Sequence, residues 1–484
     1  MHYLLKLFPE ITIKSRPVRK RMIKQLRKNV RSVVAELDPG VQISREWDNL
    51  QVESSADELQ DAIHDRLCCI PGIAVVCVVE SFPLPDMEGM LQLAIRYYGD
   101  ALEGKTFAVR CKRSGRHGFR SVDVERYVGG GLNQQTGAAG VKLVDPDVTV
   151  SLEIRNDTLF VMKSQVPGLG GYPLGCQDSV LSLISGGFDS SVSSYLCIKR
   201  GLQTHYCFFN LGGNAHEVAV KELALYLWMK YHSSHRVKFV SVPFEEVVRE
   251  ILQNVENSQM GVILKRMMVR AGEAVARQLH LKSLVTGESV AQVSSQTLAN
   301  LSVIDSACDM LVLRPLCMSD KQEIIDIARS IGTEEFSSNI PEYCAVISDK
   351  PTTKARPERI EAEEVRFDFK VLDDALARAH VQVITDLVDE VEGKGEQSVR
   401  IESEVADDCV VIDIRHPDEL ATGITLNPST ECLQIPFYTL RTQFAELDQS
   451  RQYLLYCDRG MMSRLHASHL MDEGFTNVGV YAPD

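Results

Sequence analysis

The strongest indication of the fold is the segment Val180-Leu181-Ser182-Leu183-Ile184-Ser185-Gly186-Gly187-Phe188-Asp189-Ser190. Residues 180–184 are almost continuously apolar, which is typical of a central strand in a parallel sheet. Gly186 and Gly187 follow, and residues 191–194 open a predicted helix. A glycine-rich loop between a strand and a helix directs backbone N–H groups at one point, where a phosphate binds. The segment therefore predicts a phosphate-binding α/β domain.

The residues around this loop extend the same pattern over 176–390, where predicted strands alternate with helices as in a doubly wound α/β domain. Besides 180–184, strands are predicted at 205–210, 238–243 and 283–286. The stretch from Thr286 to Thr297 follows the last of these strands, and Lys321 stands at a helix start. Because ligands gather at the carboxyl ends of parallel strands, the two loops are expected at one site. Lys321 taken alone is better explained as a residue of a surface helix cap.

The loop from Ser185 to Ser190 lacks the Lys-Ser/Thr pair of a Walker loop and the spacing of a dinucleotide-binding fingerprint. Its sequence, SGGFDS, resembles the PP-loop of ATP pyrophosphatases, which form an adenylate and release pyrophosphate. The alternative is a plain glycine-serine turn. All six residues match in strand–loop–helix order, which favours an ATP site.

The N-terminal third differs from the rest in charge. The net charge of the chain is −14, yet residues 1–174 carry 23 Lys and Arg against 21 Asp and Glu. Nine Lys or Arg and no acid lie between Ile11 and Arg31. A strand at 2–7, a helix from about Pro17 and strands at 41–43 and 50–52 predict a ferredoxin-like α+β domain over 1–56. Its basic helix face is explained equally well by a solvated surface or by nucleic acid binding.

A second α+β region covers 57–165, with strands predicted at 73–80, 106–112 and 152–160. Six basic side chains, counting His117, lie between Arg110 and Arg120. Together with the runs 124–132 and 141–147, this stretch resembles a THUMP domain. The resemblance implies RNA binding, chiefly of the acceptor end of tRNA.

The C-terminal region, 404–484, forms another α/β unit behind a predicted mobile tether at 389–396. Strands are predicted at 409–415 and 453–457, and the second ends in Cys457-Asp458-Arg459-Gly460-Met461-Met462-Ser463-Arg464. Backbone amides around such a loop, with Arg459 or Arg464, stabilise a thiolate or persulfide anion. With 411–419 upstream, the region resembles a rhodanese domain. The alternative for Cys457 is a buried cysteine at a strand end.

The whole chain resembles the ThiI family of tRNA 4-thiouridine synthetases, on SGGFDS, TGES-VAQVSSQT and the PEYCAV segment at 341–346. The resemblance implies that ATP with Mg²⁺ adenylates the uridine at position 8 of tRNA and that Cys457 then delivers sulfur as a persulfide. It assigns catalysis to Asp189, Lys321, Cys457 and Cys344, with a disulfide between Cys344 and Cys457. The predicted ATP-binding residues are Leu183, Ile184, Ser185, Gly186, Gly187, Asp189, Ser190, Lys265, Gly287 and Gln296. The predicted RNA-binding residues are Lys20, Lys24, Arg110, Lys112, Arg113, Arg116 and Arg120.

Partners follow from the same resemblance: tRNA, a cysteine desulfurase of the IscS type as persulfide donor, and a ThiS-type sulfur carrier protein for thiamine thiazole synthesis. The oligomeric state stays open, with a homodimer as one alternative. No Cys-x-x-Cys pair occurs among the 13 cysteines, so no zinc or iron–sulfur site is predicted. The absence of a signal peptide and of a long apolar run favours a cytoplasmic protein.

Two rival functions stay open at this point. Another adenylating PP-loop enzyme, such as an amidotransferase-like synthetase, would leave the THUMP-like region unexplained. A non-catalytic tRNA-binding sulfur carrier would leave the intact SGGFDS loop unexplained. Release of pyrophosphate that depends on tRNA would exclude the carrier.

Overall fold

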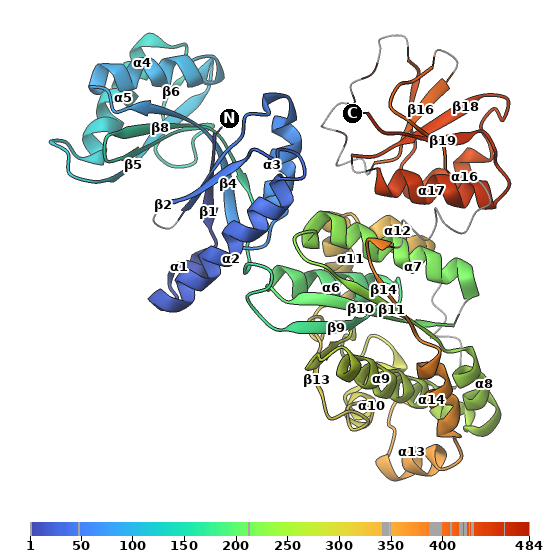
Figure 1. The fold of residues 1–484 in the computed structure, drawn as a ribbon. Helices are drawn as coiled ribbons and strands as arrows, with labels where there is room; N and C mark the ends of the chain where they lie inside the picture. Colours follow the sequence, from blue (N-terminus) through green and yellow to red (C-terminus); the bar gives the residue numbers. More distant parts are fainter. Residues whose placement is uncertain are drawn as a thin grey trace. The chain divides into compact units, whose positions relative to one another are not determined.

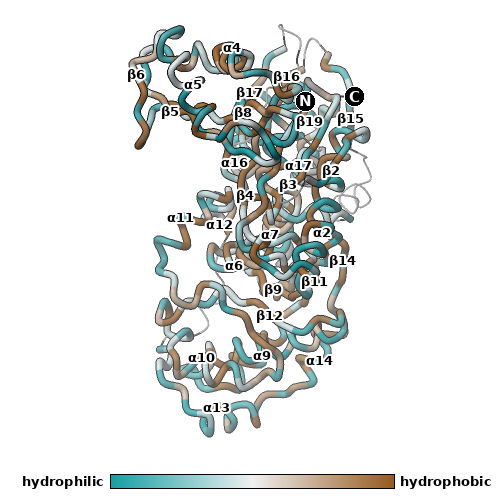
Figure 2. The backbone as a smooth tube through the Cα atoms, turned by 90° about the vertical axis from the view of Figure 1, so that its left-hand side faces the viewer, coloured by the Kyte–Doolittle hydropathy of each residue, from teal (hydrophilic) through white to brown (hydrophobic). Residues whose placement is uncertain are grey.

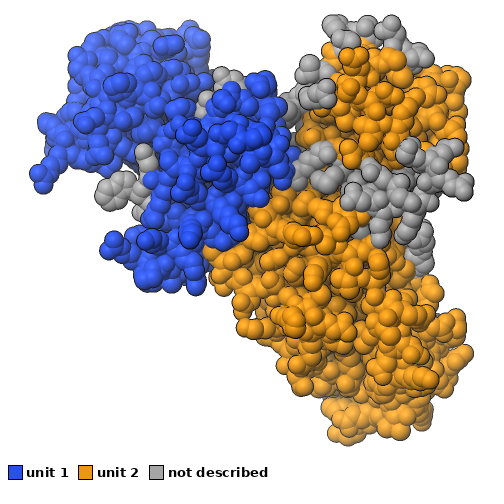
Figure 3. All heavy atoms as spheres, in the orientation of Figure 1, with its two compact units in different colours: residues 1–173 blue, residues 174–484 orange. Residues whose placement is uncertain are grey.

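The computed structural model describes residues 2–46, 49–211, 213–340, 348, 350–386, 399–406, 409–415, 420, 424, 426, 430–458 and 460–483. The chain divides into two compact units, residues 1–173 and 174–484, which Figure 3 colours separately. Hydrophobic residues concentrate along the buried strands, and hydrophilic residues on the outer helices and loops (Figure 2). Figure 1 labels the elements.

Unit 1 is built on one eight-stranded sheet in the order β2-β3-β1-β4-β8-β7-β5-β6. Most neighbouring strands are antiparallel, whereas β5 pairs in parallel with β6 and β7. The main elements are β1 (His2–Leu7), α1 (Pro9–Thr12), α2 (Arg16–Val34), β2 (Gln42–Glu46), β3 (Asn49–Glu53), α3 (Gln60–Cys68), β4 (Ile73–Pro83), α4 (Met87–Tyr98), β5 (Thr106–Ser114), α5 (Ser121–Gln135), β6 (Gly140–Val141), β7 (Val148–Arg155) and β8 (Thr158–Pro167). The predicted ferredoxin-like and THUMP regions thus share a single sheet.

Helix α2 shows why the basic segment folds as it does. Pro17 lies in its first turn, where a missing N–H costs nothing, and its apolar residues recur every three or four positions. Met22, Leu26 and Val30 are buried, whereas Lys20 and Lys24 are exposed. The helix therefore anchors one face in the core of unit 1 and presents the other, basic face to solvent.

The prediction of a single strand at 152–160 is wrong. Residues 148–155 and 158–167 form two antiparallel strands, β7 and β8, in which Arg155 pairs with Thr158. Asn156, between them, has a φ of 46°. Asn tolerates this left-handed conformation better than most residues, so two residues suffice to reverse the chain.

The larger part of unit 2 surrounds a six-stranded sheet in the order β13-β12-β9-β10-β11-β14. The first five strands are parallel, and β14 pairs antiparallel with β11 at the edge. Its strands are β9 (Ser179–Leu183), β10 (Gln203–Asn210), β11 (Lys238–Pro243), β12 (Ser283–Val285), β13 (Leu311–Leu313) and β14 (His380–Val383). Its helices include α6 (Phe188–Lys199), α7 (Gly213–Leu227), α8 (Glu245–Asn254), α9 (Met260–Gln278), α10 (Leu298–Asp305), α11 (Lys321–Ile331), α12 (Glu334–Asn339), α13 (Pro357–Glu364) and α14 (Phe369–Ala377). This is the predicted doubly wound α/β fold with an added antiparallel edge.

The C-terminal part of unit 2 contains a five-stranded parallel sheet in the order β15-β19-β18-β16-β17. Its elements are β15 (Ile401–Glu402), β16 (Cys409–Asp413), β17 (Cys432–Gln434), α16 (Phe437–Phe444), β18 (Gln452–Tyr456), α17 (Met461–Asp472) and β19 (Val478–Tyr481). The predicted tether at 389–396 lies outside the described residues. The chain is therefore a multidomain α/β and α+β protein, as the sequence predicts.

Candidate active site

The PP-loop lies between β9 and α6, at the carboxyl end of a central strand. The Ser190 hydroxyl accepts from the backbone N–H of Ser185 at 3.1 Å and donates to the carbonyl of Gly187 at 3.0 Å. Gly186 has a φ of 89°, and a Cβ there would lie 2.7 Å from Ile340 Cγ2. The position therefore needs glycine for both conformation and space.

The second predicted loop reaches the same place. A Cβ on Gly287 would lie 2.5 Å from the carbonyl oxygen of Asp189 and 2.8 Å from the Ser190 backbone nitrogen. The backbone after β12 thus touches the first turn of α6, and a side chain at 287 would push the two loops apart.

A cavity of about 390 Å³ opens beside these loops. Eight of the ten predicted ATP-binding residues line it, and Gly186 and Gly187 form the loop next to them. The eight are Leu183, Ile184, Ser185, Asp189, Ser190, Lys265, Gly287 and Gln296. Apolar side chains of Phe209, Leu264 and Met268 complete part of the wall. Contact of these residues with ATP stays a prediction.

Lys321 is more than a surface helix residue, because its ammonium pairs with the Asp189 carboxylate across 132 residues of sequence, with Nζ 3.0 Å from Oδ1. It also lies 5.2 Å from the centre of the Phe188 ring. Asp320 caps α11 and forms a capping box with Glu323, which fixes the point where the helix begins. The structure thus joins two of the predicted catalytic side chains, Asp189 and Lys321.

Sequence reasoning missed several side chains of this site. Gln292 donates to Asp189 Oδ2 at 2.8 Å, and the buried Glu288 accepts from Arg314 at 2.9 Å and from Thr286 at 2.9 Å. Gln292 and Glu288 belong to the 286–297 loop, whose position after a parallel strand predicted it at this site; within that loop, sequence reasoning did not single these two side chains out. Arg314 follows another parallel strand, β13, and this position is the signal that could have identified it.

His216 is a further missed residue of the cavity wall, lying 3.3 Å from the carbonyl oxygen of Ser185. Burial lowers the pKa of His216, and the bond to Ser185 opposes that shift in part. The ring is therefore neutral at pH 7, and its Nε2–H donates to the PP-loop carbonyl.

The second candidate centre is Cys457, which follows β18 and is 7% exposed. Its sulfur accepts from the backbone N–H of Ser463 at 3.3 Å and lies 3.4 Å from the Ser463 hydroxyl. Gly460 closes the loop by donating to the Cys457 carbonyl at 3.1 Å. Helix α17 thus directs its first turn at the sulfur, an arrangement that stabilises negative charge there.

Buried ion pairs of Arg415 hold the start of the Cys457 loop in place. The Arg415 guanidinium, 3% exposed, bonds Asp413 at 2.8 Å and Asp458 at 2.9 Å. Burial opposes the charge of Arg415, but the bonds to Asp413 and the charge of Asp458 leave its pKa raised. Because Asp458 is the residue after Cys457, the pair fixes the start of the cysteine loop. Cys344 and Arg459 lie outside the described residues, so the predicted Cys344–Cys457 disulfide and the role of Arg459 stay predictions.

The predicted RNA-binding residues of unit 1 fall into two groups. Lys20, Lys24, Lys112 and Arg116 are exposed and have no ion-pair partner among the described residues; Arg110, also exposed, bonds the Leu143 carbonyl. The others brace their own loop. Arg113 contacts His117 Nδ1 at 2.8 Å, and Arg120 pairs with Asp123 at 3.3 Å.

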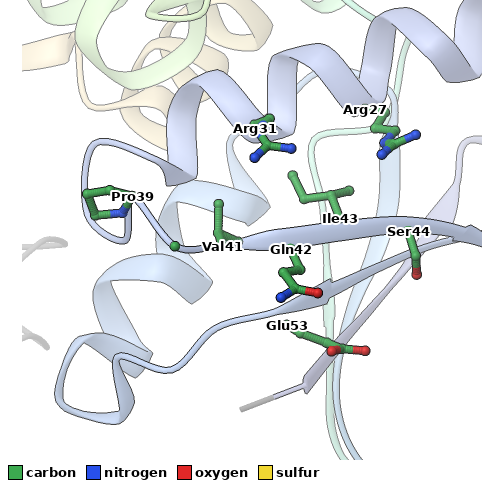
Figure 4. A pocket seen from close by; sticks show the side chains of 9 residues that line it. Arg27, Arg31, Pro39, Val41, Gln42, Ile43, Ser44 and Glu53 are labelled. Carbon is green, nitrogen blue, oxygen red and sulfur yellow. The ribbon is translucent and has the colours of Figure 1, made fainter.

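A hollow of about 490 Å³ lies between α2 and the edge strand β2. Arg27 and Arg31 project from one face of α2 toward it, and Gln42, Ser44 and Glu53 come from the strands below (Figure 4). The sequence places Arg27 and Arg31, four residues apart, on the same basic helix face as Lys20 and Lys24. They extend the basic surface that Lys20 and Lys24 begin.

Within the described part of the chain, no group of three or more His, Cys, Asp or Glu side chains is placed to hold a metal ion. In the same residues, no helix has the length and apolar character needed to span a membrane.

Four family models match this chain. They are the Thiamine biosynthesis protein (ThiI) model over 175–369, the THUMP domain over 86–162, the ThiI ferredoxin-like domain over 2–77 and the rhodanese-like domain over 399–483. The tRNA sulfurtransferase of Azotobacter vinelandii is 56% identical, with both chains covered completely. That of Saccharophagus degradans is 52% identical with the same coverage.

A solved 4-thiouridine synthetase in complex with RNA and bound ATP has a similar structure, with a TM-score of 0.68 and 25% identity. The similarity covers 79% of this chain and 99% of that one. Identity above 50% over the full length, together with the PP-loop and the cysteine loop in their expected places, shows that the chain belongs to the ThiI family of tRNA sulfurtransferases.

Proposed function

We propose that this sulfurtransferase makes 4-thiouridine at position 8 of tRNA, by adenylating the uridine with ATP and delivering sulfur from a persulfide on Cys457. The observation that carries the proposal is the convergence of the PP-loop, Gly287 and the Asp189–Lys321 pair at one cavity. The solved 4-thiouridine synthetase with RNA and ATP supports both substrates.

In the adenylation step, the uridine O4 attacks the α-phosphorus of ATP. The bond from that phosphorus to the bridging oxygen breaks, and pyrophosphate leaves. The N-terminus of α6 and the loop amides of 185–190 hold phosphate oxygens. The Lys321 ammonium neutralises charge that develops on the departing pyrophosphate.

ATP as substrate fits the cavity, because an apolar wall accommodates a base and a glycine-rich loop accommodates phosphates. Asp189 and Glu288 are the carboxylates on that wall, and each already accepts hydrogen bonds from protein donors. We infer that Mg²⁺ enters with ATP and is held chiefly by phosphates, since this ion commonly uses few protein ligands. Bound there, it supplies positive charge to the phosphates.

In the sulfur transfer step, the terminal sulfur of the Cys457 persulfide attacks C4 of the adenylated uridine, and AMP leaves. The Cys344 thiolate then attacks the Cys457 sulfur and releases 4-thiouridine, forming a Cys344–Cys457 disulfide. Two cellular thiols, or one dithiol, are oxidised to a disulfide and supply the two electrons and two protons that restore both cysteines. A cysteine desulfurase reloads Cys457, and the reducing cytoplasm suits this cycle.

Unit 1 is proposed to dock the tRNA. Its exposed cations match the phosphate backbone, which carries no sequence information but gives most of the affinity. The THUMP match at 86–162 covers Lys112, near the end of β5, and Arg116, in the loop after it.

A second function rests on the match of residues 175–369 to the family described as thiamine biosynthesis protein (ThiI). We propose that Cys457 also passes sulfur to a ThiS-type carrier protein. This role would require the Cys457 loop and would not require the RNA-binding surface of unit 1.

The main proposal is tested by incubating the full chain with unmodified tRNA, Mg-ATP, cysteine and a cysteine desulfurase. Near-ultraviolet absorbance of thiouridine in the recovered tRNA, together with release of pyrophosphate that depends on tRNA, is the expected result. A chain that binds tRNA but releases no pyrophosphate would overturn the proposal in favour of a non-catalytic carrier.

A further inference from the structure

Three segments distant in sequence meet at the Asp189 carboxylate. Lys321, at the start of α11, bonds Oδ1 at 3.0 Å, and Gln292, in the loop after β12, bonds Oδ2 at 2.8 Å. Each carboxylate oxygen therefore has one partner. The Asp189 side chain is only 20% exposed, so these two bonds lie partly out of water, where geometry matters more.

The loop that carries Gln292 is tied to the segment that carries Lys321. The Val290 N–H donates to the Cys317 carbonyl at 3.0 Å, and the Ser289 hydroxyl donates to the Ser319 carbonyl at 2.7 Å. These two bonds hold the segments that carry Gln292 and Lys321 together. A displacement of one segment is therefore transmitted to the other.

The backbone next to Gln292 is strained. Ala291 has a φ of 65°, a left-handed conformation that costs a residue with a Cβ about 1–2 kcal/mol. The bond from Ala291 N–H to the Gln296 carbonyl at 2.9 Å helps to hold it there. Such strain persists where the surrounding contacts hold the backbone in place. Here the left-handed conformation of Ala291 sets the direction in which the Gln292 side chain points.

Lys321 gains from a fixed partner. It is the first residue of α11, where the helix dipole disfavours a cation, and its side chain is 42% exposed. A long, half-exposed lysine loses conformational entropy on being ordered. A carboxylate already held in one rotamer has lost its own rotamer freedom, so forming the ion pair then costs only the conformational entropy of the lysine.

Resting on the proposed function, we propose that Gln292 is a positioning residue for adenylation. Its amide N–H holds Asp189 in the rotamer whose other oxygen aligns Lys321 with the departing pyrophosphate. Gln292 Oε1, buried on the cavity wall, has no hydrogen-bond partner among the described residues, so within them the bond to Asp189 is what orients the Gln292 amide.

The test uses the full chain with tRNA and Mg-ATP and compares Gln292→Met with the wild type. The methionine keeps the length of the side chain and removes the donor. We expect kcat for tRNA-dependent pyrophosphate release to fall about 10- to 100-fold, the range for a hydrogen bond to a charged group, with KM for ATP within about twofold. A rise in KM for ATP at unchanged kcat would overturn the positioning role.

The matched control is Gln322→Met. Gln322 also donates to an aspartate, Asp326, at 2.8 Å, but on the exposed surface of α11. Its variant is expected to keep both kcat and KM. In the double variant Asp189→Asn/Gln292→Met, the loss should not exceed that of Asp189→Asn alone, because Gln292 acts through Asp189. Losses that multiply would contradict the inference.

A second measurement separates this inference from the proposed function. The coupling between Asp189 and Lys321 is obtained from thermal unfolding of Asp189→Asn, Lys321→Met and their double variant, without substrate. It is expected to shrink when Gln292→Met is present and to stay unchanged with Gln322→Met. An unchanged coupling in the Gln292→Met background would overturn the positioning role of Gln292. Absence of tRNA-dependent pyrophosphate release by the wild-type chain would overturn only the proposed function.

Discussion

Charge is arranged differently in the two units. In unit 1, cations such as Lys112 and Arg116 are exposed and have no ion-pair partner among the described residues. In unit 2, Lys321 is paired with Asp189, and Arg415 is buried between Asp413 and Asp458. An exposed, unpaired cation can bind a phosphate group of any nucleic acid backbone. A paired and partly buried charged side chain is held in one orientation. The difference is what binding a large polyanion and performing chemistry on one atom respectively require.

The largest expected effect is that of Cys457→Ser on unit 2. Serine cannot carry a persulfide, so multiple-turnover thiolation of tRNA should fall about a thousandfold or more, measured by thiouridine absorbance. Binding of tRNA should not change, because the predicted RNA-binding residues all lie in unit 1. Cys432→Ser is the control, since Cys432 is an exposed cysteine of the same sheet. Turnover by Cys457→Ser would remove the distinction between a reactive unit and a binding unit.

The next largest effect is expected for Gly186→Ala. The left-handed φ and the close approach to Ile340 both oppose a Cβ at this position, so the loop amides must move. We expect pyrophosphate release to fall about 100-fold, as when preorganised donors are lost. Gly261→Ala is the control, because Gly261 lines the same cavity and a Cβ there meets no atom within 4 Å. Equal loss in both variants would show that the cavity, not the PP-loop geometry, limits the reaction.

Acid should destabilise unit 2 before unit 1. Burial, and to a lesser extent the charge of Lys238, lowers the pKa of His205 from 6.5 to about 4, and burial lowers that of His232 well below 6.5. Between these pKa values, each of these histidines is protonated in the unfolded chain and neutral in the folded chain. Stability from His205 is fully present above pH 6.5 and is lost as pH falls toward about 4. The loss amounts to roughly 3 kcal/mol from a shift of this size.

Hydrogen exchange at pH 7 and pH 5, corrected for the intrinsic rates, measures this effect within one chain. His205 Nδ1 accepts from the Lys238 N–H at 3.0 Å, so protonation breaks a bond between β10 and β11. Protection of β10 should fall more than that of β5 in unit 1, and His205→Gln should reduce the difference. Asp38 of unit 1 has a lowered pKa through its bond to Ser54, so its contribution is lost only below its ordinary value of 3.8. Equal loss of protection at pH 5 would contradict the histidine explanation.

Substitutions in unit 1 should have the smallest effects. Arg116→Ala is expected to weaken tRNA binding several-fold and to reduce the slope of log K against log salt by about 1, because one phosphate contact disappears. Pyrophosphate release at saturating tRNA should stay unchanged. Lys163→Ala is the control, since Lys163 already pairs with Glu80 at 3.4 Å. A fall in kcat for Arg116→Ala would show that unit 1 also takes part in the chemistry.

Features that depend on neighbouring residues could be predicted from the sequence. SGGFDS after an apolar strand predicts a loop and a helix start, and Cys457 at a strand end predicts a reactive loop, because periodicity and turn chemistry are local. Both lie in the structure where they were expected. The strand at 152–160 failed because Asn156 takes a left-handed conformation inside a run that otherwise has strand composition.

The sequence predicted that the two loops share one site, whereas the side chains that meet there became evident only in the folded chain. Lys321 taken alone indicated a surface helix cap, and its pairing with Asp189 spans 132 residues. Gln292 lies 103 residues from the same carboxylate, and Gly287 packs against the backbone of Asp189. No periodicity encodes such contacts. They arise because parallel strands distant in sequence end at one edge of a sheet, where their loops must share the same space.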